Sequence, residues 1–143
     1  AEAEALRNAM LARAGNDGDS ARWLLAGDTN DEPGGAVWKR LTSKGGASIG
    51  IDLRPADGRG EYWTYYFSSR DSYERIDILM ASEAMSRSIP KDSPRICDDP
   101  AMKASDHRML YTDLVFPDAG KDSVANSTDG ESDGSVNSAT PGE

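Results

Sequence analysis

The sequence predicts a single domain of mixed α/β or α+β class. An alanine-rich segment at the start has the three- to four-residue apolar spacing of a helix. Several later segments are short apolar or aromatic runs of the kind that form strands. The total length of 143 residues allows one domain and no more.

The first predicted element is a helix over residues 1–14. Leu6 and Met10 recur at helical spacing. Two glutamates stand near its start and Arg13 near its end, which suits the helix dipole. Gly15 follows as a plausible stop.

The next two predicted elements are a strand and a short helix. Residues 22–27 (RWLLAG) form an apolar run that predicts a central strand buried on both faces. Residues 33–41 can form a short helix with Val37, Trp38 and Leu41 on one side.

The second half of the chain predicts mostly extended structure. Apolar and aromatic runs indicate extended segments at 49–53, 61–67, 74–81 and 108–116. Ser82 is a candidate cap for a short helical turn. Residues 93–104 are loop-like in composition.

Composition excludes several classes of site and protein. Lys and Arg number 16 against 25 Asp and Glu, so the net charge is −9. No Lys/Arg block of the kind that binds duplex phosphates is present. This does not exclude a nuclease in which metal ions bridge carboxylates of the protein to phosphates of the substrate. One cysteine excludes an internal disulfide, and one histidine excludes a two-histidine site. No apolar run approaches the ~18 residues of a membrane span, so no integral membrane segment is expected.

The final segment, 118–143, differs from the rest in character. It holds six acidic residues and one lysine, with no aromatic residue, leucine or isoleucine. Such a segment cannot bury enough apolar surface to offset its ordering entropy. The expected organisation is therefore a domain over 1–117 and an acidic disordered tail or linker over 118–143.

The first chemistry-bearing cluster follows the predicted strand at 22–27. If the chain stays extended there, Asp28 and Asn30 point the same way, because side chains alternate along a strand. A carboxylate and a carboxamide then converge at a strand end. The alternative is a polar Asx turn that only ends the strand.

The second cluster centres on Asp77, which lies inside an apolar strand. A buried carboxylate must be paired or hydrogen-bonded. One candidate partner is Arg75, two residues away on the same face. The other is an imidazole, whose tautomer and charged form Asp77 would then stabilise.

The third cluster is Asp106-His107, just before the last predicted strand. A lone histidine is more often a surface or structural residue. Together with two carboxylates, a carboxamide and an orienting acid, however, it completes the parts needed for metal-assisted phosphoester hydrolysis.

Three segments resemble, in order and spacing, the last three motifs of the endonuclease/exonuclease/phosphatase superfamily. They are Gly27-Asp-Thr-Asn-Asp31, Tyr73-Glu-Arg-Ile-Asp-Ile-Leu-Met-Ala-Ser82 and Ser105-Asp-His-Arg108. The resemblance covers about residues 1–116. It implies half of a four-layer α/β sandwich, with one mostly antiparallel sheet flanked by helices.

The resemblance also implies a role for each motif residue. Asp28 would position or deprotonate the attacking water, and Asn30 would orient the phosphate. Asp106, with Asp28, would contribute to binding Mg²⁺ or Mn²⁺. His107 would contact the scissile phosphate as donor or base, and Asp77 would hold its orientation.

The resemblance leaves the first half of the family's domain without a counterpart. That half supplies an early Asn and the principal metal-binding Glu, and nothing before Asp28 matches them. The chain is therefore expected to be the C-terminal half of a phosphoesterase, partnered by an N-terminal half.

Its substrate would be a nucleic acid, a nucleotide or a lipid headgroup. The alternative is a truncated, non-catalytic relic or binding module. Thr29 replaces the family's usual Phe, which should affect packing more than chemistry.

Overall fold

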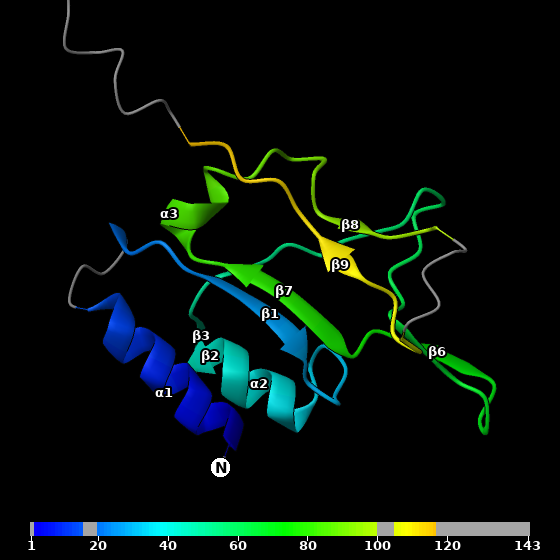
Figure 1. Ribbon diagram of the computed structural model, residues 1–143. Helices are drawn as coiled ribbons and strands as arrows, with labels where there is room; N and C mark the ends of the chain where they lie inside the picture. The colour runs from blue at the N-terminus through cyan, green and yellow to red at the C-terminus, as the bar shows by residue number, and fades with distance from the viewer. Residues whose placement is uncertain (1, 16–19, 100–104, 117–143) are drawn as a thin grey trace, which may run out of the picture.

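The computed structural model describes residues 2–15, 20–99 and 105–116, so the predicted tail at 118–143 lies outside it. The described chain has the predicted α+β class (Figure 1). Its helices are α1 (Glu2–Ala14), α2 (Ala36–Thr42) and α3 (Glu83–Ser86). Its strands are β1 (Leu24–Asp28), β2 (Ser43–Lys44), β3 (Ala47–Ser48), β4 (Ile51–Asp52), β5 (Tyr65–Phe67), β6 (Ser72–Glu74), β7 (Asp77–Ala81), β8 (Arg95–Ile96) and β9 (Leu110–Tyr111).

The main sheet has three strands in the order β1-β7-β4, all antiparallel to their neighbours. Three further antiparallel pairs join β2 to β3, β5 to β6, and β8 to β9. In the β1–β7 ladder, Leu24 pairs with Ala81 and Asp28 with Asp77. This register brings two of the predicted site residues to the same end of the sheet.

The core lies between the main sheet and α2. Trp38 and Leu41 of the helix pack against Ile78 and Met80 of β7, and all four side chains are buried. Helices α1 and α2 lie on this same face of the sheet (Figure 1). The buried Arg7 joins the two helices, because its guanidinium donates to backbone carbonyls at the end of α2 and just beyond it.

The prediction of a central strand at 22–27 is wrong. β1 is an edge strand, and four of its five residues are exposed, including Leu24. The central strand is β7, in which every residue after Asp77 is buried. A short apolar run does not reveal how many neighbours a strand has, and only the pairing decides it.

The predicted strand at 74–81 divides into β6 and β7. The break falls at Arg75 and Ile76, where threonine hydroxyls join the backbone hydrogen bonding. The Ile76 N–H donates to Thr64 Oγ1, and the Ile76 carbonyl accepts from the hydroxyl of Thr29. The strands predicted at 61–67 and 108–116 are likewise shorter than expected, and the loop-like 93–104 contains β8.

The helix predictions are closer to the structure. α1 spans Glu2–Ala14, with Gly15 after it at a φ of 72°, a value that glycine adopts without strain. Ser82 caps α3, because its Oγ accepts from the Met85 N–H at 3.1 Å. α2 begins at Ala36, three residues later than the predicted 33–41.

Candidate active site

Three of the predicted site residues meet in the structure. Asp28 ends β1, Asp77 begins β7, and His107 lies in the segment before β9. One ligand atom of each lies within 4.8 Å of the others. The antiparallel register places the two carboxylates side by side, and the chain returns 30 residues later to add the imidazole.

His107 uses its two ring nitrogens differently. Nδ1 lies 2.9 Å from Asp77 Oδ2, within hydrogen-bond distance. Nε2 faces Asp28, 3.9 Å from its Oδ2. The ring also lies beside Tyr65, with ring centroids 4.8 Å apart. His107 is therefore held on one side and open on the other.

The surroundings of His107 favour its charged form. Partial burial lowers the pKa of the imidazole, but the hydrogen bond to Asp77 opposes that effect. The negative charges of Asp77, Asp28 and Asp106 add to the opposition, so the net result is a pKa above the ordinary value of 6.5. In the charged form both ring nitrogens donate, which leaves Nε2–H available for a phosphoryl oxygen.

Asn30 approaches Asp28 through a turn. The Asn30 N–H donates to Asp28 Oδ1 at 2.7 Å, and its side-chain amide lies 3.2 Å from Asp28 Oδ2. The φ of Asn30 is 48°, so the chain is no longer extended. The argument from strand alternation is therefore wrong. The Asx-turn alternative describes the backbone, and the turn itself brings the two side chains together.

The alternative ion pair between Arg75 and Asp77 is absent from the described residues. Arg75 Nη2 instead lies 2.6 and 2.7 Å from the two carboxylate oxygens of Asp52. The Arg75 guanidinium also stacks over the Trp38 ring at 4.9 Å. Because Arg75 pairs with Asp52, the Asp77 carboxylate is available to bond His107.

Asp106 lies near these residues but outside the cluster that Asp28, Asp77 and His107 form. Its side chain is exposed. It lines an open depression of about 810 Å³ that also includes Asp77, His107 and Trp63. The depression is large enough for a small phosphoester.

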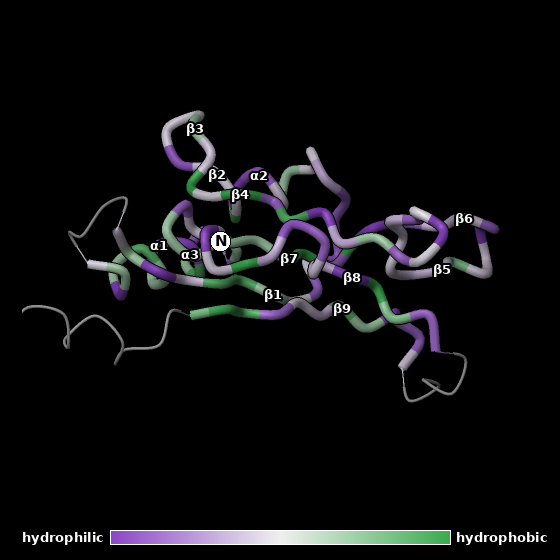
Figure 2. The backbone as a smooth tube through the Cα atoms, turned by 90° about the horizontal axis from the view of Figure 1, so that it is seen from above, coloured by the Kyte–Doolittle hydropathy of each residue, from purple (hydrophilic) through white to green (hydrophobic). Residues whose placement is uncertain are grey.

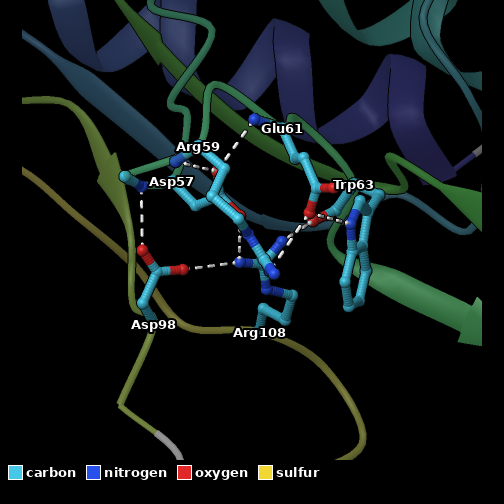
Figure 3. Close-up of polar contacts among 7 residues, drawn as sticks. Asp57, Arg59, Glu61, Trp63, Asp98 and Arg108 are labelled. Atoms are coloured by element: carbon cyan, nitrogen blue, oxygen red, sulfur yellow. Dashed lines mark hydrogen bonds and ion pairs between the residues drawn. The ribbon is translucent and has the colours of Figure 1, made fainter.

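A buried ion-pair cluster beside the site has no counterpart in the sequence analysis. Arg108 donates to Asp57 at 2.8 Å and to Asp98 at 2.9 Å, and its guanidinium stacks over Trp63 at 4.1 Å (Figure 3). The hydrogen bonds that Asp57 accepts hold its pKa well below the usual range despite burial. No sequence signal links Asp57 to Arg108, because 51 residues separate them.

Among the described residues, Asp28, Asp77 and His107 each offer one ligand atom close enough to the others to share a cation. Asp77 Oδ2 and His107 Nδ1 already bond each other, so Asp28 is the carboxylate of this group that is not bonded to the imidazole. Mg²⁺ commonly takes one or two carboxylates together with substrate phosphate. Asp106, the other predicted metal ligand, lines a different depression from Asp28.

No protein-family model, curated protein or solved structure matches the chain. Arguments about its function therefore rest on the residues and their geometry. Within the described ranges, no helix has the length and apolar character needed to cross a membrane.

Proposed function

We propose that the chain is the C-terminal part of a divalent-metal-dependent phosphoesterase, a hydrolase of the endonuclease/exonuclease/phosphatase type. The observation that carries the proposal is the meeting of Asp28, Asp77 and His107, with His107 Nδ1 at 2.9 Å from Asp77. General acid–base chemistry suits a sheet end that holds one acid, an imidazole and a second acid that orients the imidazole ring.

In this proposal each residue has one task. Asp28 orients the attacking water and accepts its proton, and Asn30 holds the Asp28 carboxylate through two hydrogen bonds. His107 donates from Nε2 to a phosphoryl oxygen, and the raised pKa supports its charged form. Asp77 keeps the ring in the orientation that points Nε2 outward.

The proposed cofactor is Mg²⁺ or Mn²⁺. When bound, such an ion neutralises phosphate charge and lowers the pKa of a bound water. Asp106 and Asp28 would hold it from this chain. Two carboxylates fill only part of the coordination shell of such an ion, so the proposal also includes a further ligand from a partner polypeptide.

The proposed partner is the N-terminal half of the same domain. Large apolar side chains are exposed at one position of β1 and along residues 109–116, and Figure 2 shows hydrophobic (green) stretches in β1 and in the segment that follows β9. Exposed apolar surface of this kind marks interaction sites. These side chains are Leu24, Met109, Tyr111, Leu114, Val115 and Phe116.

The proposed substrate is a phosphodiester or phosphomonoester in a nucleic acid, a nucleotide or a lipid headgroup. The net charge of −9 disfavours tight binding to duplex DNA through its phosphates. A smaller phosphoester suits the acidic surface better.

The alternative is a non-catalytic relic or binding module that retains the late motifs. What favours it is that nothing before Asp28 matches the principal metal-binding Glu that the family resemblance implies. The enzyme hypothesis and the relic hypothesis differ in what the coding DNA upstream of Ala1 should contain. In-frame strands that bear an Asn and then a Glu support the enzyme, whereas a stop codon or unrelated sequence supports the relic.

The decisive experiment measures phosphodiester hydrolysis by the polypeptide extended with that upstream half. Bis(p-nitrophenyl) phosphate serves as the probe, with and without Mg²⁺. His107→Ala should reduce the Mg²⁺-dependent rate by at least about 100-fold. Asp92→Asn is the control, because Asp92 is an exposed residue outside the proposed machinery.

Two results would count against the proposal. Full activity of His107→Ala would remove the assigned role of the imidazole. The other result is a lack of Mg²⁺-dependent hydrolysis with this probe and also with nucleic-acid, nucleotide and phospholipid substrates. That result would favour the non-catalytic relic over the enzyme.

A further inference from the structure

Thr64 is a fully buried residue at the junction between Asp77 and the segment that carries His107. Its Oγ1 accepts hydrogen bonds from the backbone N–H groups of Ile76 at 3.1 Å and of Asp77 at 3.2 Å. Its carbonyl oxygen accepts from the backbone N–H of Arg108 at 2.8 Å. One buried residue therefore holds the backbone at Asp77 and the backbone next to His107.

The side chain of Arg108 anchors the same segment a second time. We call its contacts with Asp57, Asp98 and Trp63 the Arg108 clamp (Figure 3). The Asp57 carboxylate has no exposed surface, so breaking this pair would leave the buried charge with the largely exposed Arg59 guanidinium, 3.6 Å away, as its ion partner. Because Arg108 directly follows His107, the clamp restricts backbone movement at His107.

We propose that Thr64, with the Arg108 clamp, is a positioning residue that sets the distance between His107 and Asp77. None of the hydrogen bonds described for Thr64 or Arg108 goes to the imidazole. The catalytic importance of the spacing rests on the proposed function. The spacing itself is a property of the folded chain and is testable without any substrate.

The positions of the two residues explain why they need such anchors. Asp77 is the first residue of β7, and His107 precedes β9, so both lie where regular strand pairing ends. A hydrogen bond such as the 2.9 Å contact between them tolerates only a few tenths of an ångström of drift. Supporting hydrogen bonds of this kind hold a pair at a productive distance.

Ser82 offers a matched control within the same chain. It is also buried, and its Oγ accepts from the backbone N–H groups of Met85 at 3.1 Å and of Trp23 at 3.2 Å. These hydrogen bonds lie beyond Ala81, at the opposite end of β7 from Asp77. Loss of its hydroxyl disturbs a buried acceptor of two backbone N–H groups without touching the proposed anchor.

The test uses proton–nitrogen NMR of the full chain. His107 is its only histidine, so the imidazole resonances have a single source. Wild type should show a low-field Nδ1–H resonance, retained because the proton is bonded to Asp77. Thr64→Val should lose it, while Thr64→Ser, which keeps the hydroxyl, and Ser82→Ala should retain it.

Several outcomes would overturn the proposal. One is an unchanged Nδ1–H resonance in folded Thr64→Val, and another is an equal loss in Ser82→Ala, which would indicate general loosening. If Thr64→Val does not fold, Arg108→Lys takes its place, because lysine keeps the charge but cannot reach both Asp57 and Asp98. An unchanged resonance there overturns the proposal too. No result of this experiment depends on phosphoester hydrolysis, so the two proposals fail separately.

Discussion

His107 Nδ1 lies 2.9 Å from Asp77 Oδ2, and this contact determines which ring nitrogen faces outward. With Nδ1 engaged, Nε2 is the nitrogen directed toward Asp28, at 3.9 Å. The gap between Nε2 and Asp28 is too long for a hydrogen bond but short enough for both groups to contact one bound oxygen. The relationship therefore supports a site for a small ligand between them.

Replacing Asp77 with asparagine should impair the proposed chemistry while preserving shape. The amide carries no charge, so the substitution removes the negative charge that favours the imidazolium and weakens the hydrogen bond that holds the ring. We expect Mg²⁺-dependent hydrolysis by the extended polypeptide to fall about 10²–10⁴-fold. Rates measured beside Asp92→Asn check this, and equal rates in the two variants would contradict the role of Asp77.

The pH dependence of stability should report the His107 pair. The pKa of His107 is raised in the folded state, so the folded chain holds the proton more tightly than the unfolded chain. The stabilisation is complete below the ordinary value of 6.5 and is lost as pH rises through the folded-state pKa. Urea unfolding in divalent-free buffer should thus show wild type losing more stability than His107→Gln as pH rises from about 6. Parallel curves would contradict the shift.

Removing the carboxylate of Asp31 should destabilise α2. Gly35 stands at the N-cap position and has no side chain, and Asp31 Oδ2 accepts instead from the N–H groups of Val37 at 2.8 Å and Trp38 at 3.1 Å. Asp31→Ala should cost about 1 kcal/mol of unfolding free energy. Asp31→Asn keeps an oxygen acceptor and should cost less. Equal losses would show that the cap contributes little.

Truncating a side chain of the central strand should be far more damaging than truncating one on the surface. Met80 is buried in the core with Trp38, Leu41 and Ile78. Met80→Ala should lower the unfolding free energy by about 2–5 kcal/mol, through lost burial and the remaining cavity. Met109→Ala, at an exposed position, should stay within about 0.5 kcal/mol. Denaturant midpoints measure both, and similar losses would place the core elsewhere.

Local signals in the sequence were sufficient for several elements. The spacing of Leu6 and Met10 predicts α1, and the serine at position 82 predicts the cap of α3. These features depend on neighbours within a turn or two of the chain. Hydrogen bonds of this range require only the residues on either side, so the sequence carries them directly.

Local signals failed where distant backbone groups compete. The run at 22–27 has the composition of a central strand, yet β1 lies at the edge of the sheet because β7 pairs with both β1 and β4. The strand predicted through Arg75 and Ile76 is interrupted where the Ile76 N–H bonds to the hydroxyl of Thr64, which lies 12 residues earlier in the chain. Apolar patterning indicates burial but does not identify the partner.

The sequence by itself determined the class of the fold, most of its helices and the residue types available for chemistry. It also placed Asp28 just after a predicted strand, Asp77 inside one and His107 just before another. Only the tertiary structure decided that the three lie within 4.8 Å, and that Thr64 and the Arg108 clamp surround them. The reason is physical: these contacts join residues 10 to 51 positions apart, and their geometry follows from strand register and packing rather than from neighbours in the chain.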